Sequence, residues 1–113
     1  MRPAANATNA YQSAITSTAW MFFRYLDENR DIVRLLSRND PRFWLVFSNE
    51  MSDFSMTFAG TSNRSRVFTI YSSNAIIGCY RDYFEGRLTM PPEEFVQYII
   101  EIAGKANTFM VNS

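Results

Sequence analysis

Residues 65–85 read SRVFTIYSSNAIIGCYRDYFE, and this stretch decides the fold class. When it is drawn as a helix, apolar side chains occur on nearly every side. The strict alternation of apolar and polar residues that marks a strand is absent. A helix that is apolar all round is buried on more than one side. In a chain of only 113 residues the second side needs another chain, so the stretch predicts a long helix and a homodimer.

Helical periodicity continues on both sides of this stretch. Upstream, apolar residues form one face from Ile15 to Leu26, and a second stripe contains Phe43, Phe47, Met51, Phe54 and Phe58. Downstream, a helix that starts at Pro92 presents a face of Phe95, Val96, Ile99 and Ile100. We therefore expect an all-α domain of about five helices over residues 10–113, after a flexible lead-in or linker at residues 1–9.

The helix boundaries are predicted from a few turn residues. Pro41 suits the first position of a helix that Asp40 caps. Gly86 is expected to end the 65–85 helix in a left-handed conformation. Ile32, Leu35 and Leu36 form the apolar face of a short helix between the two upstream segments.

Composition excludes several classes of function. Apolar residues make up 47% of the chain and eleven acids balance eleven bases, which excludes a disordered chain and argues against DNA binding by this chain alone. The sequence has no His, so we expect no enzyme, no metal site and no cofactor. The single Cys79 indicates a reducing, cytoplasmic location and is expected to be an inert structural thiol. Polar residues interrupt every apolar run, so no membrane span is expected.

Two sequence features carry a family resemblance. Residues 71–103 read YSSNAIIGCYRDYFEGRLTMPPEEFVQYIIEIA, an apolar helix with a central Gly, a Gly after its aromatic end, and a Pro-Glu-Glu start to the next helix. Residues 25–36 read YLDENRDIVRLL, a helix end followed by a short Leu-rich helix. In their order and spacing these features resemble the C-terminal regulatory domain of the TetR family of transcriptional regulators, over about residues 13–107.

The resemblance implies a dimer and a ligand site. In the family the last two long helices, here residues 65–85 and 92–107, form a four-helix bundle with a second subunit. The earlier helices enclose an effector pocket. The helix-turn-helix domain of the family has no counterpart in this sequence, and whether it was truncated or is naturally absent stays open. The residues expected at the dimer interface are Phe68, Ala75, Gly78, Cys79, Phe95, Ile99 and Ile102.

Aromatic residues exceed what a simple helical bundle needs, and this excess suggests an effector cavity. A small apolar or aromatic effector with one polar group would suit such a lining. Aromatic stripes at helical spacing are more often plain core, and that is the alternative interpretation of the same residues. The candidate ligand-binding residues are Trp20, Phe23, Phe47, Met51, Phe54, Tyr71 and Asn74.

Three further features keep alternatives open. Asn74 can bond an effector, bond across the dimer, or lie on the surface. Gly78 favours close approach of another helix, since a mid-helix Gly otherwise costs about 1 kcal/mol against Ala. The arginines at positions 30, 34, 38 and 42 form either a contact to phosphate or an anionic effector, or a solvated face.

These observations predict the effector-sensing and dimerisation domain of a TetR-like regulator, without its DNA-binding domain. The alternative is a helical protein–protein interaction module that dimerises and binds no small molecule.

Overall fold

The chain is all-helical in the computed structural model, which describes the backbone of residues 3–57 and 62–111 and the side chains of residues 12–57 and 62–105. Within these ranges there are five α-helices and no strand, which confirms the all-α prediction. The helices are α1 (Pro3–Glu28), α2 (Arg30–Asn39), α3 (Phe43–Met56), α4 (Asn63–Phe84) and α5 (Pro92–Val111).

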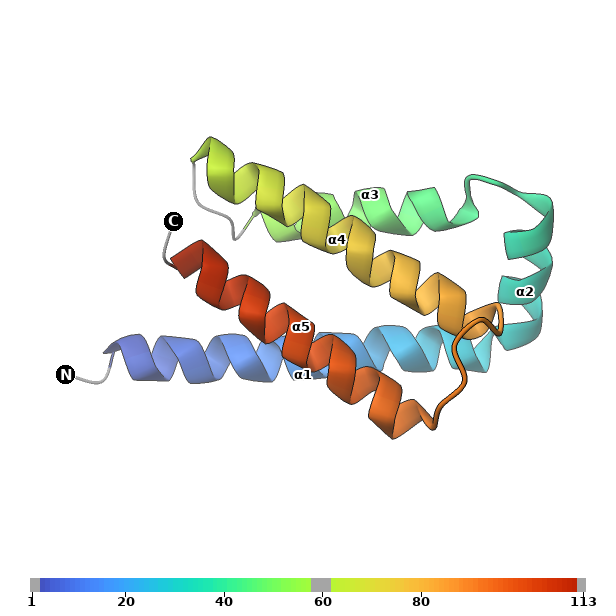
Figure 1. Cartoon of the computed structure of the whole chain (residues 1–113), viewed down its shortest axis with the longest axis horizontal. Helices are drawn as coiled ribbons and strands as arrows, with labels where there is room; N and C mark the ends of the chain where they lie inside the picture. Colours follow the sequence, from blue (N-terminus) through green and yellow to red (C-terminus); the bar gives the residue numbers. More distant parts are fainter. Residues whose placement is uncertain (1–2, 58–61, 112–113) are drawn as a thin grey trace.

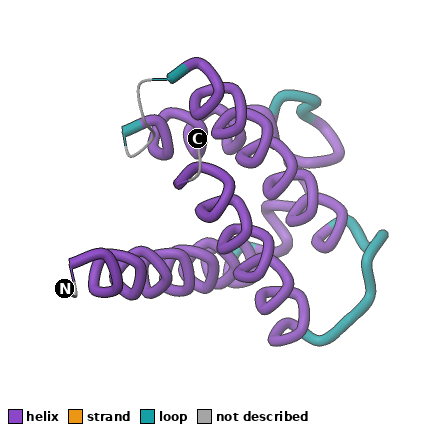
Figure 2. The backbone as a smooth tube through the Cα atoms, turned by 60° about the vertical axis from the view of Figure 1, so that its left-hand side comes forward, coloured by secondary structure: helices purple, strands orange, loops and turns teal. Residues whose placement is uncertain are grey.

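The four longer helices form two layers. In Figure 1, α4 and α5 cross in front of α3 and α1, while the short α2 joins α1 to α3 at one end of the molecule. The main packing partners are α3 with α4 and α1 with α5. Figure 2 shows the same helices as tubes, with a loop leading from the end of α4 to the start of α5. One face of α4 and α5 is therefore turned away from the other layer.

An aromatic cluster joins α1, α4 and α5 at the centre of the molecule. Phe23 is only 3% exposed and its ring lies against those of Phe84 and Phe95, with centroids 5.3 and 6.3 Å away. Tyr83 stacks on Phe95 at 4.4 Å. The buried Tyr80 hydroxyl donates to the carbonyl oxygen of Ala19 at 2.9 Å and ties α4 to α1. The faces predicted on α1 and α5 are the ones that build this core.

Small polar residues fill the contact between α3 and α4. Ser48 on α3 is buried, as are Ser65, Thr69 and Ser73 at four-residue spacing on α4. The Thr69 hydroxyl donates to the Ser65 carbonyl oxygen at 2.9 Å, one turn earlier on α4. Short side chains whose hydroxyls bond within their own helix allow two helices to approach closely. The first half of α4 therefore buries small residues, whereas its second half buries Ile77, Tyr80 and Phe84.

The buried face of α3 corrects the sequence-based expectation. Trp44 and Ser48 are buried, Phe43, Phe47 and Met51 are half-buried, and Phe54 is 61% exposed near the end of the helix. The prediction for Phe58 lies outside the described residues. The stripe was predicted from large apolar residues alone, whereas the close contact with α4 selects the face that carries Ser48.

Two helix starts also differ from the prediction. Helix α1 begins at Pro3, so the lead-in predicted for residues 1–9 is helical from its third residue. Helix α3 begins at Phe43, two residues after Pro41. Asp40 does act locally, since its carboxylate accepts a hydrogen bond from the Arg42 backbone N–H at 2.9 Å. This bond forms a turn before the helix instead of capping its first turn.

Helix α2 turns its apolar flank outward. Val33 is its buried anchor, whereas Ile32, Leu35 and Leu36 are all exposed. The end of α4 behaves as predicted, because Gly86 has a φ of 90° and lies in the left-handed region. Its N–H donates to the Tyr83 carbonyl oxygen at 3.2 Å.

Candidate functional site

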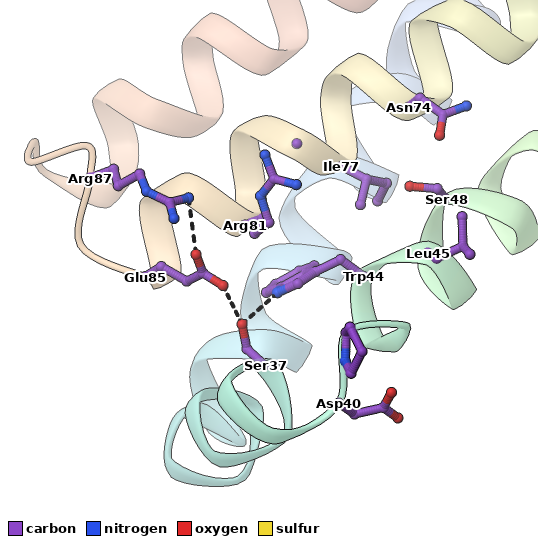
Figure 3. Close-up of a pocket in the computed structure, with 12 residues that line it drawn as sticks. Ser37, Asp40, Trp44, Leu45, Ser48, Asn74, Ile77, Arg81, Glu85 and Arg87 are labelled. Atoms are coloured by element: carbon purple, nitrogen blue, oxygen red, sulfur yellow. Dashed lines mark hydrogen bonds and ion pairs between the residues drawn. The ribbon is translucent and has the colours of Figure 1, made fainter.

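A polar cleft lies where α2, the start of α3 and the second half of α4 meet (Figure 3). Its volume is about 570 Å³, within the usual range for small-molecule sites. Apolar, polar and charged side chains all contribute to its lining. The lining residues are Ser37, Asp40, Pro41, Trp44, Leu45, Ser48, Asn74, Ile77, Gly78, Arg81, Glu85 and Arg87.

A chain of hydrogen bonds crosses the cleft and joins its walls. The Trp44 indole N–H donates to the Ser37 hydroxyl oxygen at 2.8 Å, and that hydroxyl donates to the Glu85 carboxylate. Glu85 also pairs with Arg87, whose Nη1 lies 3.0 Å from its other oxygen. Figure 3 shows Ser37 between the indole and the carboxylate. The chain links α2, α3 and the end of α4.

Asp82 extends the charged part of this wall. Its carboxylate lies 2.8 Å from Arg87 Nη1 and 3.3 Å from Arg81 Nε. The hydrogen bond from Arg87, and then the bond from Arg81, hold the pKa of Asp82 below its ordinary value. Arg87 is therefore shared by two carboxylates and has a defined position at the rim.

A second pocket adjoins the first at its α2 side. It also measures about 570 Å³, and it shares Ser37, Glu85 and Arg87 with the first. Its remaining lining residues are Arg34, Arg38 and Phe84. The two pockets are neighbours, with Trp44 in the first and the α2 arginines in the second, and the bonded residues Ser37, Glu85 and Arg87 lie between them.

The chemistry of the cleft suits binding. Glu85 is engaged by Ser37 and Arg87, and the Asp40 carboxylate accepts from the Arg42 backbone N–H. In the part of the chain that the structure describes, no cluster of three His, Cys, Asp or Glu is placed to hold a metal ion. What the cleft offers is an indole, hydroxyls and guanidinium groups, which recognise ligands by stacking and hydrogen bonding.

Only one of the candidate ligand-binding residues, Asn74, lines this cleft. Its side-chain amide donates to the Ile70 carbonyl oxygen at 2.8 Å, one turn earlier on α4. Tyr71 is 68% exposed, and it lies outside the cleft, as the exposed Phe54 does.

The other aromatic candidates are packed against neighbouring rings. Trp20 lies against Phe23 with ring centroids 6.0 Å apart. Phe47 contacts Phe22 and Phe43 at 5.3 and 5.2 Å. Met51 is half-buried and packs on the same core. These four candidates, Trp20, Phe23, Phe47 and Met51, lie where core side chains touch one another, and the structure does not gather the seven candidates into one cavity.

The predicted interface residues divide into two groups. Phe95 and Ile99 are buried within their own chain, so they contribute to its core. On the outward side, Ala75 and Ile102 are exposed, while Phe68, Gly78 and Cys79 are partly exposed. A Cβ added at Gly78 meets nothing within 4 Å among the described atoms, so the surface there is open.

The residues that organise the cleft were not predicted as a site from the sequence. Ser37, Trp44 and Glu85 are brought together from three helix ends, and Ser37 and Glu85 are 48 residues apart along the chain. The available signal was Trp44, because a buried indole N–H normally needs a hydrogen-bond acceptor. That signal identifies the need for a partner but not which residue supplies it.

No protein-family model, no curated protein sequence and no solved structure matches the chain. Among its described residues, no helix is both long enough and apolar enough to cross a membrane.

Proposed function

We propose that this chain is the dimerisation and effector-sensing domain of a TetR-like regulator, and that it pairs with a second copy through the outward faces of α4 and α5. The effector site in this proposal is the polar cleft, in place of the aromatic residues singled out from the sequence. DNA binding is assigned to a different part of such a regulator.

The outward apolar stripe on α4 and α5 carries this proposal. On α4 it contains Phe68, Tyr71 and Ala75, which recur every three to four residues, and Tyr71 is 68% exposed. On α5, Tyr98 and Ile102 lie one turn apart and are each 46% exposed. Both helices belong to the same layer (Figure 1). Two helices with adjacent outward apolar faces are the elements from which a four-helix interface is built.

Gly78 supports the same interface. It continues the α4 stripe after Ala75, and the space where its Cβ would lie is open. In a helix interior a Gly costs about 1 kcal/mol relative to Ala, so its presence calls for a compensating contact. Gly78 also lines the cleft, so it lies at the border between the cleft and the outward stripe, and close approach of the partner's α4 from the side of the stripe would provide that contact.

The cleft supports the sensing half of the proposal. It lies between α2, α3 and α4, so a bound molecule contacts three helices at once. The bond from Ser37 to Glu85 ties α2 to the end of α4, and a ligand that replaces this bond would change how firmly α2 is held. A ligand shifts a conformational balance only when it binds one arrangement better than the other.

Charge reversal on the outward stripe tests the interface. Tyr71→Glu and Ile102→Glu should each convert the dimer to a monomer, because they place a carboxylate in the buried centre of the contact. Val46→Glu is the matched control, since Val46 is 56% exposed on α3, in the other layer. We expect the control to keep the wild-type mass in light scattering. Equal masses for all four proteins would contradict the proposed interface.

The interaction module that binds no small molecule is a second candidate. The observation that favours it is the packing of Trp20, Phe23 and Phe47 against neighbouring rings, which fills the region where an apolar cavity was expected. A thermal-shift screen separates the two candidates, because a ligand that binds only the folded state raises the melting temperature. A dimer whose melting point responds to no ligand would support the module.

A further inference from the structure

We propose that the cleft binds a small organic anion, with a doubly charged phosphate or dicarboxylate group at its α2 end and an aromatic or aliphatic body toward Trp44. This inference names the ligand class for the proposed sensor. It rests on the proposed function only in so far as the bound molecule is called an effector.

The cationic end of the cleft contains two arginines without a counter-charge. Arg34 and Arg38 lie one turn apart on α2, and both line the second pocket. Among the described residues neither forms an ion pair, whereas Arg30, Arg81 and Arg87 all do. Like charges one turn apart on a helix destabilise it. An anion held between the two guanidinium groups removes this repulsion.

Arg87 and Ser37 line the second pocket together with Arg34 and Arg38. Arg87 reaches it from the link after α4, where Glu85 and Asp82 hold its Nη1 in place. Ser37 lies on the same helix as the two arginines, and its single O–H is donated to Glu85, so it can donate to an anion only in place of that bond. The second pocket thus has three guanidinium groups and one carboxylate, and that carboxylate, Glu85, is already engaged by Ser37 and Arg87. Guanidinium groups bind phosphate and carboxylate in a paired, planar geometry.

The apolar end of the cleft accounts for the body of the ligand. Trp44, Leu45 and Ile77 line the first pocket, which joins the second at Ser37 and Glu85. An anion that also carries a ring can bind its charged group on α2 and place its ring against Leu45, which is 50% exposed, and against the small exposed edge of Trp44. Inorganic phosphate can use only the first of these contacts, so it is expected to bind more weakly.

Calorimetry with phenyl phosphate tests the inference. Phenyl phosphate should bind the dimer, while phenol and inorganic phosphate should bind at least about tenfold more weakly, since each lacks one set of contacts. Arg34→Gln and Arg38→Gln should each weaken phenyl phosphate binding by about tenfold. Arg66→Gln is the matched control, because it removes the same charge about 27 Å along α4 from Phe84, at 1.5 Å per residue.

Three results would overturn the inference. These are no binding of phenyl phosphate, an equal loss in Arg66→Gln, and binding of phenol as tight as that of phenyl phosphate. If inorganic phosphate binds as tightly as phenyl phosphate, the claim that the ring of the ligand binds at the apolar end near Trp44 is refuted. Light scattering on the same samples separates this inference from the proposed function. A monomer that binds phenyl phosphate refutes the dimeric regulator and keeps the site, whereas a dimer that does not bind it refutes the site.

Discussion

Tyr80 gives the sharpest test of the core, because its hydroxyl is buried and bonded to a backbone carbonyl on another helix. The side chain is 1% exposed, and its hydroxyl donates to the Ala19 carbonyl oxygen at 2.9 Å. Burial, and then the nearby Cys79 thiolate, raise the pKa of Tyr80 well above its ordinary value of 10.0. Tyr80→Phe removes both the hydrogen bond and the titration while keeping the ring against Phe95.

The difference in free energy of unfolding between the wild type and Tyr80→Phe changes with pH. At pH 7 the substitution should lower the free energy of unfolding by about 1 kcal/mol, the typical net value of one hydrogen bond. Because the folded-state pKa is raised, the stability that depends on the protonated phenol is complete below pH 10 and is lost as the pH rises above it. At pH 11 the titration of Tyr80 should have lowered the free energy of unfolding of the wild type by about 1.4 kcal/mol. Tyr80→Phe has no phenol at this position, so its free energy of unfolding does not fall for this reason. The two proteins should therefore be about equally stable near pH 11.

Urea unfolding followed by circular dichroism at pH 7, 9 and 11 measures this crossover. Both proteins are compared at one protein concentration, since a dimer's stability depends on it. The other groups with raised pKa values, Cys79, Tyr83 and Tyr98, are present in both proteins and largely cancel in the difference. A stability difference that is the same at pH 7 and pH 11 would refute the buried, hydrogen-bonded phenol.

Three further predictions concern the core, a turn and the thiol. Phe23→Ala should lower the free energy of unfolding by about 3–5 kcal/mol, as measured by urea unfolding. Phe54 is 61% exposed, so Phe54→Ala should change the same quantity by no more than about 0.5 kcal/mol. Similar losses in the two variants would contradict the packing described for α1 and α3. Gly86→Ala should lower the free energy of unfolding by about 1–2 kcal/mol, because φ is 90° there although nothing lies within 4 Å of the new Cβ; an unchanged melting curve would argue against the left-handed turn. Burial, and then the charge of Asp82, raise the pKa of Cys79, so iodoacetamide at pH 7 should modify it more slowly in the folded chain than in urea, and equal rates would contradict its burial.

Helix positions were predictable from the sequence because they depend on local pattern. The face of α1 with Ala19, Phe23 and Leu26 is buried as the 3.6-residue period predicts, and so is the α5 face with Phe95 and Ile99. Gly86 was predictable for a similar reason, since a left-handed residue after a helix is most often Gly. Each of these features is decided within a few turns of chain.

Features that depend on which helices meet were not predictable in the same way. The pattern of large apolar residues on α3 favoured the Phe47 and Phe54 face, but α3 buries Ser48, and α4, its main packing partner, buries a row of small residues. A search for hydrophobic periodicity does not count Ser and Thr as core residues, although their small size decides how closely two helices can approach. The cleft was missed for a related reason, because Ser37 and Glu85 become neighbours only when α2 and the end of α4 meet.

The mass of the unmodified chain in solution tests the central claim most directly, because the outward stripe on α4 and α5 is proposed to be covered by a second copy. One chain weighs 13.1 kDa. Light scattering at micromolar concentration should give about twice that value. The mass should fall toward that of one chain only when the protein is diluted below the dissociation constant of the dimer. A mass of one chain at every concentration would contradict the proposed dimer and leave Tyr71 and Ile102 as solvent-exposed side chains.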